Sequence, residues 1–296
     1  MIKTKIIADS IYTDYATGKE HRVTTFELEY PRYIHSELLT HRVFSRNAAS
    51  SRAIPLDRMI DLVVDSPVVP KWTLNQKGMA GNESVDTYTT ALATAEWMDA
   101  RDYMIKKVNR LKELGIHKQN ANRLLEPFQH IKTILTGTDF ENFFHLRISP
   151  EAQPEIRELA TNMKDAYMSH MPNKLYPQDI HCPYFDKPVK RDNLADILIS
   201  TALCAQVSYR KENTDPEVVA RIVNRLIATD RIHASPFEHI CAPNYVGENQ
   251  RGNLTGFIQL RHKVEDIKPN IDAIIKFNNT TDYYKELINF GSTIWL

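Results

Sequence analysis

The segment 41–52, HRVFSRNAASSR, has the clearest chemical character in this sequence. It contains three arginines, three serines and one asparagine but no carboxylate, although the whole chain has 37 acidic and 37 basic residues. Guanidinium groups pair with phosphate oxygens through two parallel hydrogen bonds, and hydroxyl groups add further donors. The segment therefore predicts a binding site for an anion, such as the phosphate of a nucleotide or cofactor. The alternative is a solvated basic turn.

The same segment resembles the signature of the flavin-dependent thymidylate synthases, RHRxxSxNExSxRY. Three specified positions differ, because Thr40, Ala48 and Ala53 stand where the family has Arg, Glu and Tyr. An alternating stretch, 23–30, followed by Pro31 leads into the segment as it does in that family. The six matching residues are His41, Arg42, Ser45, Asn47, Ser50 and Arg52. The resemblance implies flavin contacts for His41, Arg42, Ser45 and Asn47, and nucleotide contacts for Ser50, Ser51 and Arg52.

Two further segments extend the resemblance. Residues 115–127 resemble the family's helix that ends in a nucleotide-binding arginine, which is Arg123 here. Residues 142–147, NFFHLR, followed by AQPEI, resemble the family's NFLxLR…AQxEI segment. The resemblance implies that Arg147 lies against the pyrimidine ring and that Asn142 contributes to the cofactor site.

Arg147 has an alternative role, and two positions near it differ from the family pattern. Arg147 can instead form a salt bridge with a nearby carboxylate such as Glu151 or Glu155, since paired surface charges are common. Thr136 and Thr138 stand where the family tends to have an Asn and an Arg for flavin.

A third segment matches the family in an unexpected position. Residues 205–209, AQVSY, and 233–239, HASPFEH, resemble elements that precede the signature in the family but follow it here. We interpret this order as a circular permutation, which proteins tolerate because chain termini often lie close together. The alternative is two domains of independent origin. By the resemblance, His233 and Glu238 belong to the folate and flavin region, whereas an isolated His or Glu more often has a structural role.

Residues 252–263 follow this segment and contain no GxGxxG pattern, which argues against a Rossmann dinucleotide site. Gln259, Arg261 and Lys263 alternate with apolar residues, as on a strand with one polar face. We expect Gln259 and Arg261 to line the substrate site. The alternative is an exposed polar strand face.

These motifs need a scaffold that positions them, and the hydrophobic pattern predicts an α/β fold of the α+β type. We expect a mixed or antiparallel sheet packed with long helices, non-Rossmann and similar to the family fold. The expected strands are 2–8 and 22–30, and the loop 66–84 is rich in Pro, Gly and Asn. A helix over 85–114 is expected to pack in the core and to stop at Gly115. The other expected helices are 32–43, 152–171, 192–205 and 216–228, the last with Asp215 as its N-cap.

Composition limits the class of protein. The 296 residues, 42% of them hydrophobic, suffice for a sizeable core, and the net charge of zero argues against binding to nucleic-acid polymers or membrane surfaces. No apolar run is long enough to cross a membrane, so we expect a cytoplasmic location. Three distant cysteines without a CxxC pattern disfavour disulfides and a metal site. Only Cys182, beside His181, suggests a nucleophile.

We expect a signature region at 1–175, a linker at 176–191 and a region at 192–296 that completes the same domain.

Together the resemblance implies flavin-dependent C5 methylation of dUMP to dTMP by a homotetramer. FAD is the expected cofactor, with methylenetetrahydrofolate and NADPH as co-substrates. The expected catalytic residues are Arg147, Arg52 and Ser50. One alternative is C5 hydroxymethylation of dUMP or modification of dCMP, and another is a nucleotide-binding homologue without catalysis.

Overall fold

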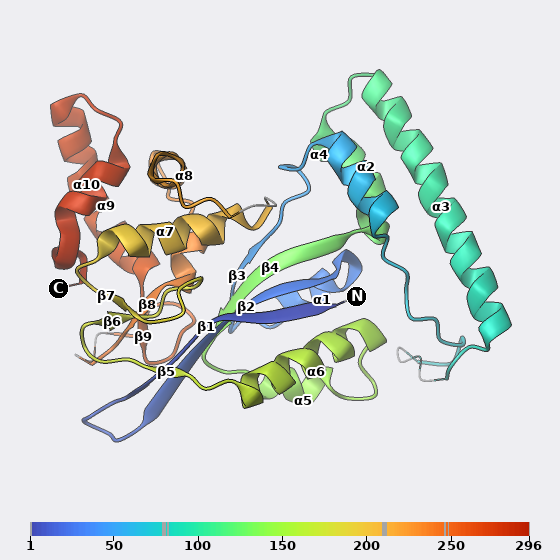
Figure 1. The fold of residues 1–296 in the computed structure, drawn as a ribbon, viewed down its shortest axis with the longest axis horizontal. Coiled ribbons are helices and arrows are strands. Elements are labelled where there is room, and N and C mark those ends of the chain that lie inside the picture. The colour runs from blue at the N-terminus through green and yellow to red at the C-terminus, as the bar shows by residue number, and fades with distance from the viewer. Residues whose placement is uncertain are drawn as a thin grey trace.

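Two long strands near the start of the chain form the centre of the sheet (Figure 1). β1 (Lys3–Thr13) and β2 (Glu20–Pro31) pair antiparallel, as their alternating side chains predict. The sheet order is β3-β4-β2-β1-β5, and β5 joins β1 in parallel while the other pairs are antiparallel. The remaining strands are β3 (Ser45–Ala48), β4 (His130–Gly137) and β5 (Asn173–Lys174). This mixed sheet confirms the predicted fold class. The structure is a computed structural model that describes residues 2–78, 81, 83–208, 212–245, 247 and 249–295.

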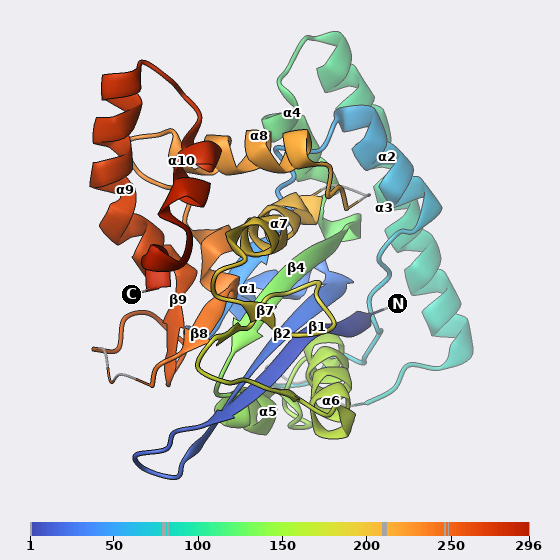
Figure 2. The same cartoon turned by 60° about the vertical axis from the view of Figure 1, so that its left-hand side comes forward.

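The two faces of the sheet are covered by different parts of the chain (Figures 1 and 2). α5 (Glu141–Arg147) and α6 (Pro154–Ser169) pack on one face, where Phe26 and Leu28 of β2 join an apolar cluster with Phe143. The other face is covered by C-terminal elements, and Ile7 and Ile134 contact the cluster formed there. The central strands are therefore buried from both sides.

The C-terminal elements begin with two short strands and then alternate helices with a second small hairpin. The helices α7 and α8 have Asn193 and Asp215 as side-chain N-caps, which confirms the predicted N-cap at Asp215. The elements are β6 (Asp179–Ile180), β7 (Val189–Lys190), α7 (Leu194–Ala205), η3 (Gln206–Ser208), α8 (Pro216–Ile227), η4 (Ser235–His239), β8 (Cys241–Pro243), β9 (Phe257–Gln259), α9 (Leu260–Asn278), α10 (Tyr283–Phe290) and η5 (Gly291–Trp295).

A separate group of helices lies at the end of the sheet where β4 begins and has its own apolar cluster (Figure 1). The long helix is confirmed at α3, and Gly115 follows it with a φ of 73°, the left-handed conformation that ends helices. Its predicted core role is wrong for the first half, where Tyr88 and Leu92 are 74% and 51% exposed. Only Val108 of α3 is fully buried. The group comprises α2 (Leu56–Asp65), α3 (Thr87–Glu113), α4 (Lys118–Ala121) and η2 (Asn122–Phe128).

Two predicted elements differ from the structure because long-range pairing overrides the local pattern. The helix expected at 32–43 is shorter, with η1 (Arg32–Ile34) followed by α1 (His35–Leu39). The chain then turns and becomes extended, since Ser45–Ala48 pairs with β4. The strand expected through residue 263 ends at Gln259, where α9 begins. The prediction that Arg261 and Lys263 alternate along a strand is therefore wrong.

The segment expected to be a linker, 176–191, is packed into the structure rather than exposed. Ile180, His181, Cys182 and Val189 are buried, and His181 exchanges backbone hydrogen bonds with Cys241. The segment therefore attaches the C-terminal elements to the sheet. None of the helices in the described part of the chain has the length and apolar character needed to cross a bilayer.

Candidate functional site

Three donors from separate segments meet at one carboxylate oxygen, Oε1 of Glu126. The guanidinium of Arg123 donates to it at 2.7 Å, that of Arg32 lies at 3.0 Å, and the Ser51 hydroxyl donates at 3.4 Å. We name these four residues the Glu126 cluster. Two arginines and a serine hydroxyl form the kind of donor set that binds a phosphate. The structure thus brings together two residues predicted to bind the substrate, Ser51 and Arg123, from positions 72 residues apart in the sequence.

The loop that carries Ser51 is held in place by backbone contacts. The fully buried side chain of Asn122 donates to the carbonyl oxygens of Ser51 and Ile54 at 2.7 and 3.1 Å. Ala49 donates its backbone N–H to the carbonyl of Lys132 at 2.8 Å, which continues the β3–β4 pairing. These bonds place the Ser51 side chain beside η2, where Glu126 and Arg123 lie.

Two cavities adjoin at this cluster. One, which we name the serine cavity, has a volume of about 480 Å³, and its polar lining includes Ser51, Arg58 and Lys132. The other, the tryptophan groove, has about 660 Å³ and is lined by Trp97, Arg123 and Glu126 among others. Both volumes suit a small organic ligand. Arg32 lines both cavities, so the Arg32–Glu126 pair lies between them.

Sequence reasoning missed Glu126, Arg32 and Asn122. A signal for Glu126 was available, because a carboxylate three residues after Arg123 in a helical segment is placed to pair with it. Arg32 and Asn122 had no comparable signal. Their contacts join segments far apart in the sequence, which only the fold determines.

A second cluster surrounds Arg147 at the end of α5. Its guanidinium donates to Nε2 of His41 at 2.9 Å, to Glu37 at 3.0 Å and to the Thr40 hydroxyl at 3.1 Å. Arg147 thus does form an ion pair, but with Glu37, and the alternative pairing with Glu151 or Glu155 is wrong. We name these four residues the Arg147 cluster.

Burial and two neighbouring arginines favour the neutral form of His41. Burial lowers the pKa of His41, and the positive charges of Arg147 and Arg46 lower it further. Because Nε2 accepts from Arg147, the ring proton belongs on Nδ1. Residue 41 lies after the end of α1, and the turn that follows Leu39 brings His41 to the Arg147 side chain that also pairs with Glu37.

The C-terminal elements occupy the polar groups of β3. Gln259 donates to the Ser45 hydroxyl at 2.9 Å, and Asn47 donates to the Cys204 carbonyl at 2.6 Å. The Ser50 backbone N–H donates to the Ser208 hydroxyl at 3.0 Å. The Ser235 hydroxyl of the SPFEH-like segment also donates to Oδ1 of Asn47 at 3.4 Å, so this segment lies beside the signature segment.

Gln259 and Arg261 lie near Glu238 and not at the Glu126 cluster. Gln259 donates to the Glu238 carbonyl oxygen at 2.7 Å, and Arg261 pairs with the Glu238 carboxylate at 2.5 Å. Arg261 also pairs with Glu265 one helical turn away. These contacts connect η4, β9 and α9.

Four other predicted site residues are exposed: Arg42, Arg52, Asn142 and His233. Within the described residues, the side chains of Arg42 and Arg52 make neither a hydrogen bond nor an ion pair. Asn142 lines a surface cavity of about 720 Å³ together with His145 and Lys164. One chain therefore leaves part of the predicted site open to solvent.

A buried polar chain links the sheet to the C-terminal elements. The Thr25 hydroxyl contacts Nε2 of His181 at 2.8 Å and the Thr136 hydroxyl at 2.7 Å. Thr136 in turn contacts Nδ1 of His239 at 2.8 Å, and Ser10 contacts Nδ1 of His181 at 2.9 Å. Burial lowers the pKa of His181 to about 4 and that of His239 to about 3. Both rings are therefore neutral at physiological pH.

Cys182, the one thiol that the sequence suggested as a nucleophile, is fully enclosed. Burial raises its pKa well above the ordinary value, which disfavours the thiolate. Cys204 and Cys241 are also free and buried. The geometry thus gives no support to a cysteine nucleophile.

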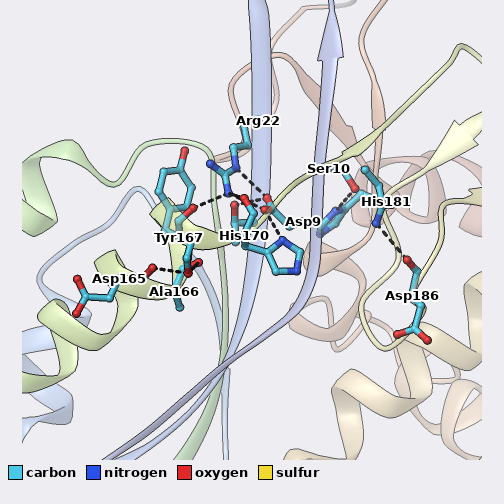
Figure 3. A network of polar contacts seen from close by, with 12 residues as sticks. Asp9, Ser10, Arg22, Asp165, Ala166, Tyr167, His170, His181 and Asp186 are labelled. Atoms are coloured by element: carbon cyan, nitrogen blue, oxygen red, sulfur yellow. Dashed lines mark hydrogen bonds and ion pairs between the residues drawn. The ribbon is translucent and has the colours of Figure 1, made fainter.

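A third charged network, around Asp9, fastens α6 to the sheet (Figure 3). Both oxygens of the fully buried Asp9 carboxylate accept from Arg22, at 3.0 and 2.6 Å, and Thr24 donates at 2.8 Å. The His170 ring lies at 2.9 Å from the same carboxylate, and Arg22 also donates to the Tyr167 carbonyl oxygen. This network fixes the end of α6, which packs against the helix that carries Arg147.

Comparison with known proteins gives matches to one family. A family model described as "Thymidylate synthase complementing protein" matches residues 3–173. The flavin-dependent thymidylate synthase of Sulfolobus acidocaldarius is 30% identical over 163 residues, which are 54% of this chain and 55% of that protein. The corresponding protein of Saccharolobus solfataricus is 25% identical over 191 residues, 63% of this chain and 65% of that protein. The chain thus spans between half and two thirds of the length of these relatives.

Among solved structures, the UMP/dUMP methylase PolB from Streptomyces cacaoi has limited similarity. Its complex with 5-Br UMP gives a TM-score of 0.45 at 18% identity, covering 56% of this chain and 88% of PolB. Its complex with 5-Br dUMP gives a TM-score of 0.46 at 19% identity, covering 56% of this chain and 90% of PolB.

Proposed function

Because the chain belongs to the family of thymidylate synthase complementing proteins, we propose that it is a methyltransferase that methylates C5 of dUMP with a flavin cofactor. The observation that carries the proposal is the meeting of Arg32, Arg123 and Ser51 at one point beside two cavities. Ser51 and Arg123 are also the positions at which the family resemblance places nucleotide contacts. In this proposal they bind the nucleotide phosphate, and Arg32 adds a second guanidinium.

Arg147 is proposed to act on the pyrimidine. Methylation at C5 builds negative charge on the pyrimidine carbonyl oxygens, and a positioned guanidinium stabilises that charge. The three donors of Arg147 are held by His41, Glu37 and Thr40, so the side chain is oriented before the substrate arrives. Ser50 and Arg52, which neighbour Ser51, complete the proposed substrate contacts.

Within one chain, only some of the residues predicted to bind flavin have side chains that are free to contact it. The side chains of Ser45 and Asn47 are engaged by the C-terminal elements, whereas Arg42 and Asn142 are exposed and available. Flavin would supply hydride transfer and relay the carbon from methylenetetrahydrofolate, with NADPH as reductant.

The exposed residues support the proposal of a site completed by a second copy of the chain in a homotetramer. Arg42 and Arg52 face solvent, and the apolar side chains of Leu39, Val43 and Leu146 are 41%, 45% and 48% exposed near the Arg147 cluster in sequence. Exposed apolar side chains mark candidate interaction surfaces, and arginine is enriched at protein interfaces. Sedimentation or light scattering of the purified protein tests the assembly.

The direct test of the proposed function is a product assay. The protein is incubated with dUMP, FAD, methylenetetrahydrofolate and NADPH, and the nucleotide is analysed by mass spectrometry. A gain of one methylene group on dUMP supports the proposal. An added oxygen, or a modified dCMP in a parallel reaction, would instead assign the related hydroxymethylation or dCMP chemistry. Nucleotide binding without any product or flavin binding would assign a non-catalytic homologue.

A further inference from the structure

Glu126 occupies the position in which a bound anion would be expected. Its Oε1 atom is the common acceptor for Arg123, Arg32 and Ser51, at 2.7, 3.0 and 3.4 Å. A single carboxylate oxygen that faces two guanidinium groups and a hydroxyl resembles one oxygen of a phosphate in the same donor set. In this structure the Glu126 carboxylate therefore accepts the hydrogen bonds that these three donors could give to a phosphate.

We propose that Glu126 is an internal competitor of the nucleotide, whose phosphate displaces the Glu126 carboxylate from Arg123, Arg32 and Ser51. The proposal deepens the proposed function, on which it rests for the identity of the ligand. The carboxylate competes because both anions need the same donors, and it also repels a phosphate close by. Glu126 therefore lowers the affinity for the nucleotide and selects for ligands whose anionic group can replace it.

The surroundings of Glu126 allow such a displacement. Its side chain is 27% exposed and lines the tryptophan groove, so the carboxylate can turn toward solvent. Arg123 is 55% exposed and Arg32 is 19% exposed. Ser51, which is buried, opens onto the serine cavity. A phosphate would therefore reach the donors from the cavities once the Glu126 carboxylate has turned away.

Removing the charge of Glu126 while keeping its shape tests the proposal. We expect Glu126→Gln to bind dUMP and inorganic phosphate about tenfold more tightly than the unchanged protein, since one like charge at contact distance is removed. Isothermal titration calorimetry at fixed salt measures both ligands. Glu113→Gln is the matched control, because Glu113 also pairs with an arginine three residues before it, Arg110 at 2.8 Å, but lies at the end of α3. Its affinities should stay unchanged within about twofold.

The outcomes separate this proposal from the proposed function. Equal or weaker dUMP binding by Glu126→Gln overturns the competitor role and leaves dUMP as the substrate. A gain for inorganic phosphate with no dUMP binding by either protein supports the competitor role and refutes dUMP as the ligand. Glu126→Ala provides a second variant if the glutamine forms new hydrogen bonds, and it should show the same gain. Thermal melts of each variant establish that it is folded.

Discussion

Replacing Asp9 by Asn gives the sharpest test of how the sheet supports the site. The substitution keeps the shape of the side chain and removes its charge. Asp9 is fully buried and accepts two hydrogen bonds from Arg22, one from Thr24 and one contact from His170. Removing one member of a buried ion pair typically costs about 3–5 kcal/mol. In the variant, Arg22 keeps its hydrogen bond to the Tyr167 carbonyl oxygen and its position 3.8 Å from the centre of the Tyr167 ring. We therefore expect the free energy of unfolding to fall by about 2–4 kcal/mol.

This loss converts into a measurable shift in melting temperature. The unfolding entropy of about 2.1 cal/mol/K per residue gives roughly 0.6 kcal/mol/K for a chain of 296 residues. The melting temperature of Asp9→Asn should therefore fall by about 3–6 °C in a calorimetric scan. Asp57→Asn is the control, because Asp57 is 71% exposed in its pair with Lys112 and should shift the melting temperature by less than about 1 °C. Equal melting temperatures for the unchanged protein and Asp9→Asn would refute the stabilising role of this network.

Three further predictions concern activity, pH and packing. Arg147→Ala should lower kcat/KM for dTMP formation by about 100-fold or more, and a decrease of less than threefold would remove Arg147 from the proposed chemistry. Because burial lowers the pKa of His181 to about 4 and that of His239 to about 3, the unfolded state takes up protons first as pH falls. The free energy of unfolding should be maximal above about pH 6.5 and should decrease toward pH 4 by about 1.4 kcal/mol per pH unit for each histidine; urea titrations at pH 7.5, 5.5 and 4.5 measure this, and a flat profile would contradict it. Gly137→Ala should destabilise the protein by about 1–3 kcal/mol, because its added Cβ would lie 2.7 Å from the Phe44 ring; an unchanged urea midpoint would show that Phe44 moves freely.

The amino-acid sequence by itself determined the regular elements with strong local signals. The alternating pattern of 22–30 predicted β2, and the start of α8 was fixed by Asp215 and Pro216, whose side-chain cap and ring favour a helix N-terminus. It also pointed to Ser51 and Arg123 as candidate nucleotide contacts, because Ser51 lies inside the signature-like segment and Arg123 lies in a second segment that resembles the family. These features depend on neighbours within a few residues, so the local sequence is sufficient.

The tertiary structure alone decided how these residues meet. The predicted helix at 32–43 ends at Leu39 because the following residues pair with β4, about 90 positions further along the chain. The same long-range pairing turns the loop so that Ser51 faces Glu126, from which it is separated by 75 residues in the sequence. Hydrogen bonds between distant segments form only when the whole chain packs, and burial of apolar side chains on both faces of the sheet decides which segments become neighbours. The donor set that two arginines and a serine offer to an anion is therefore a property of the fold.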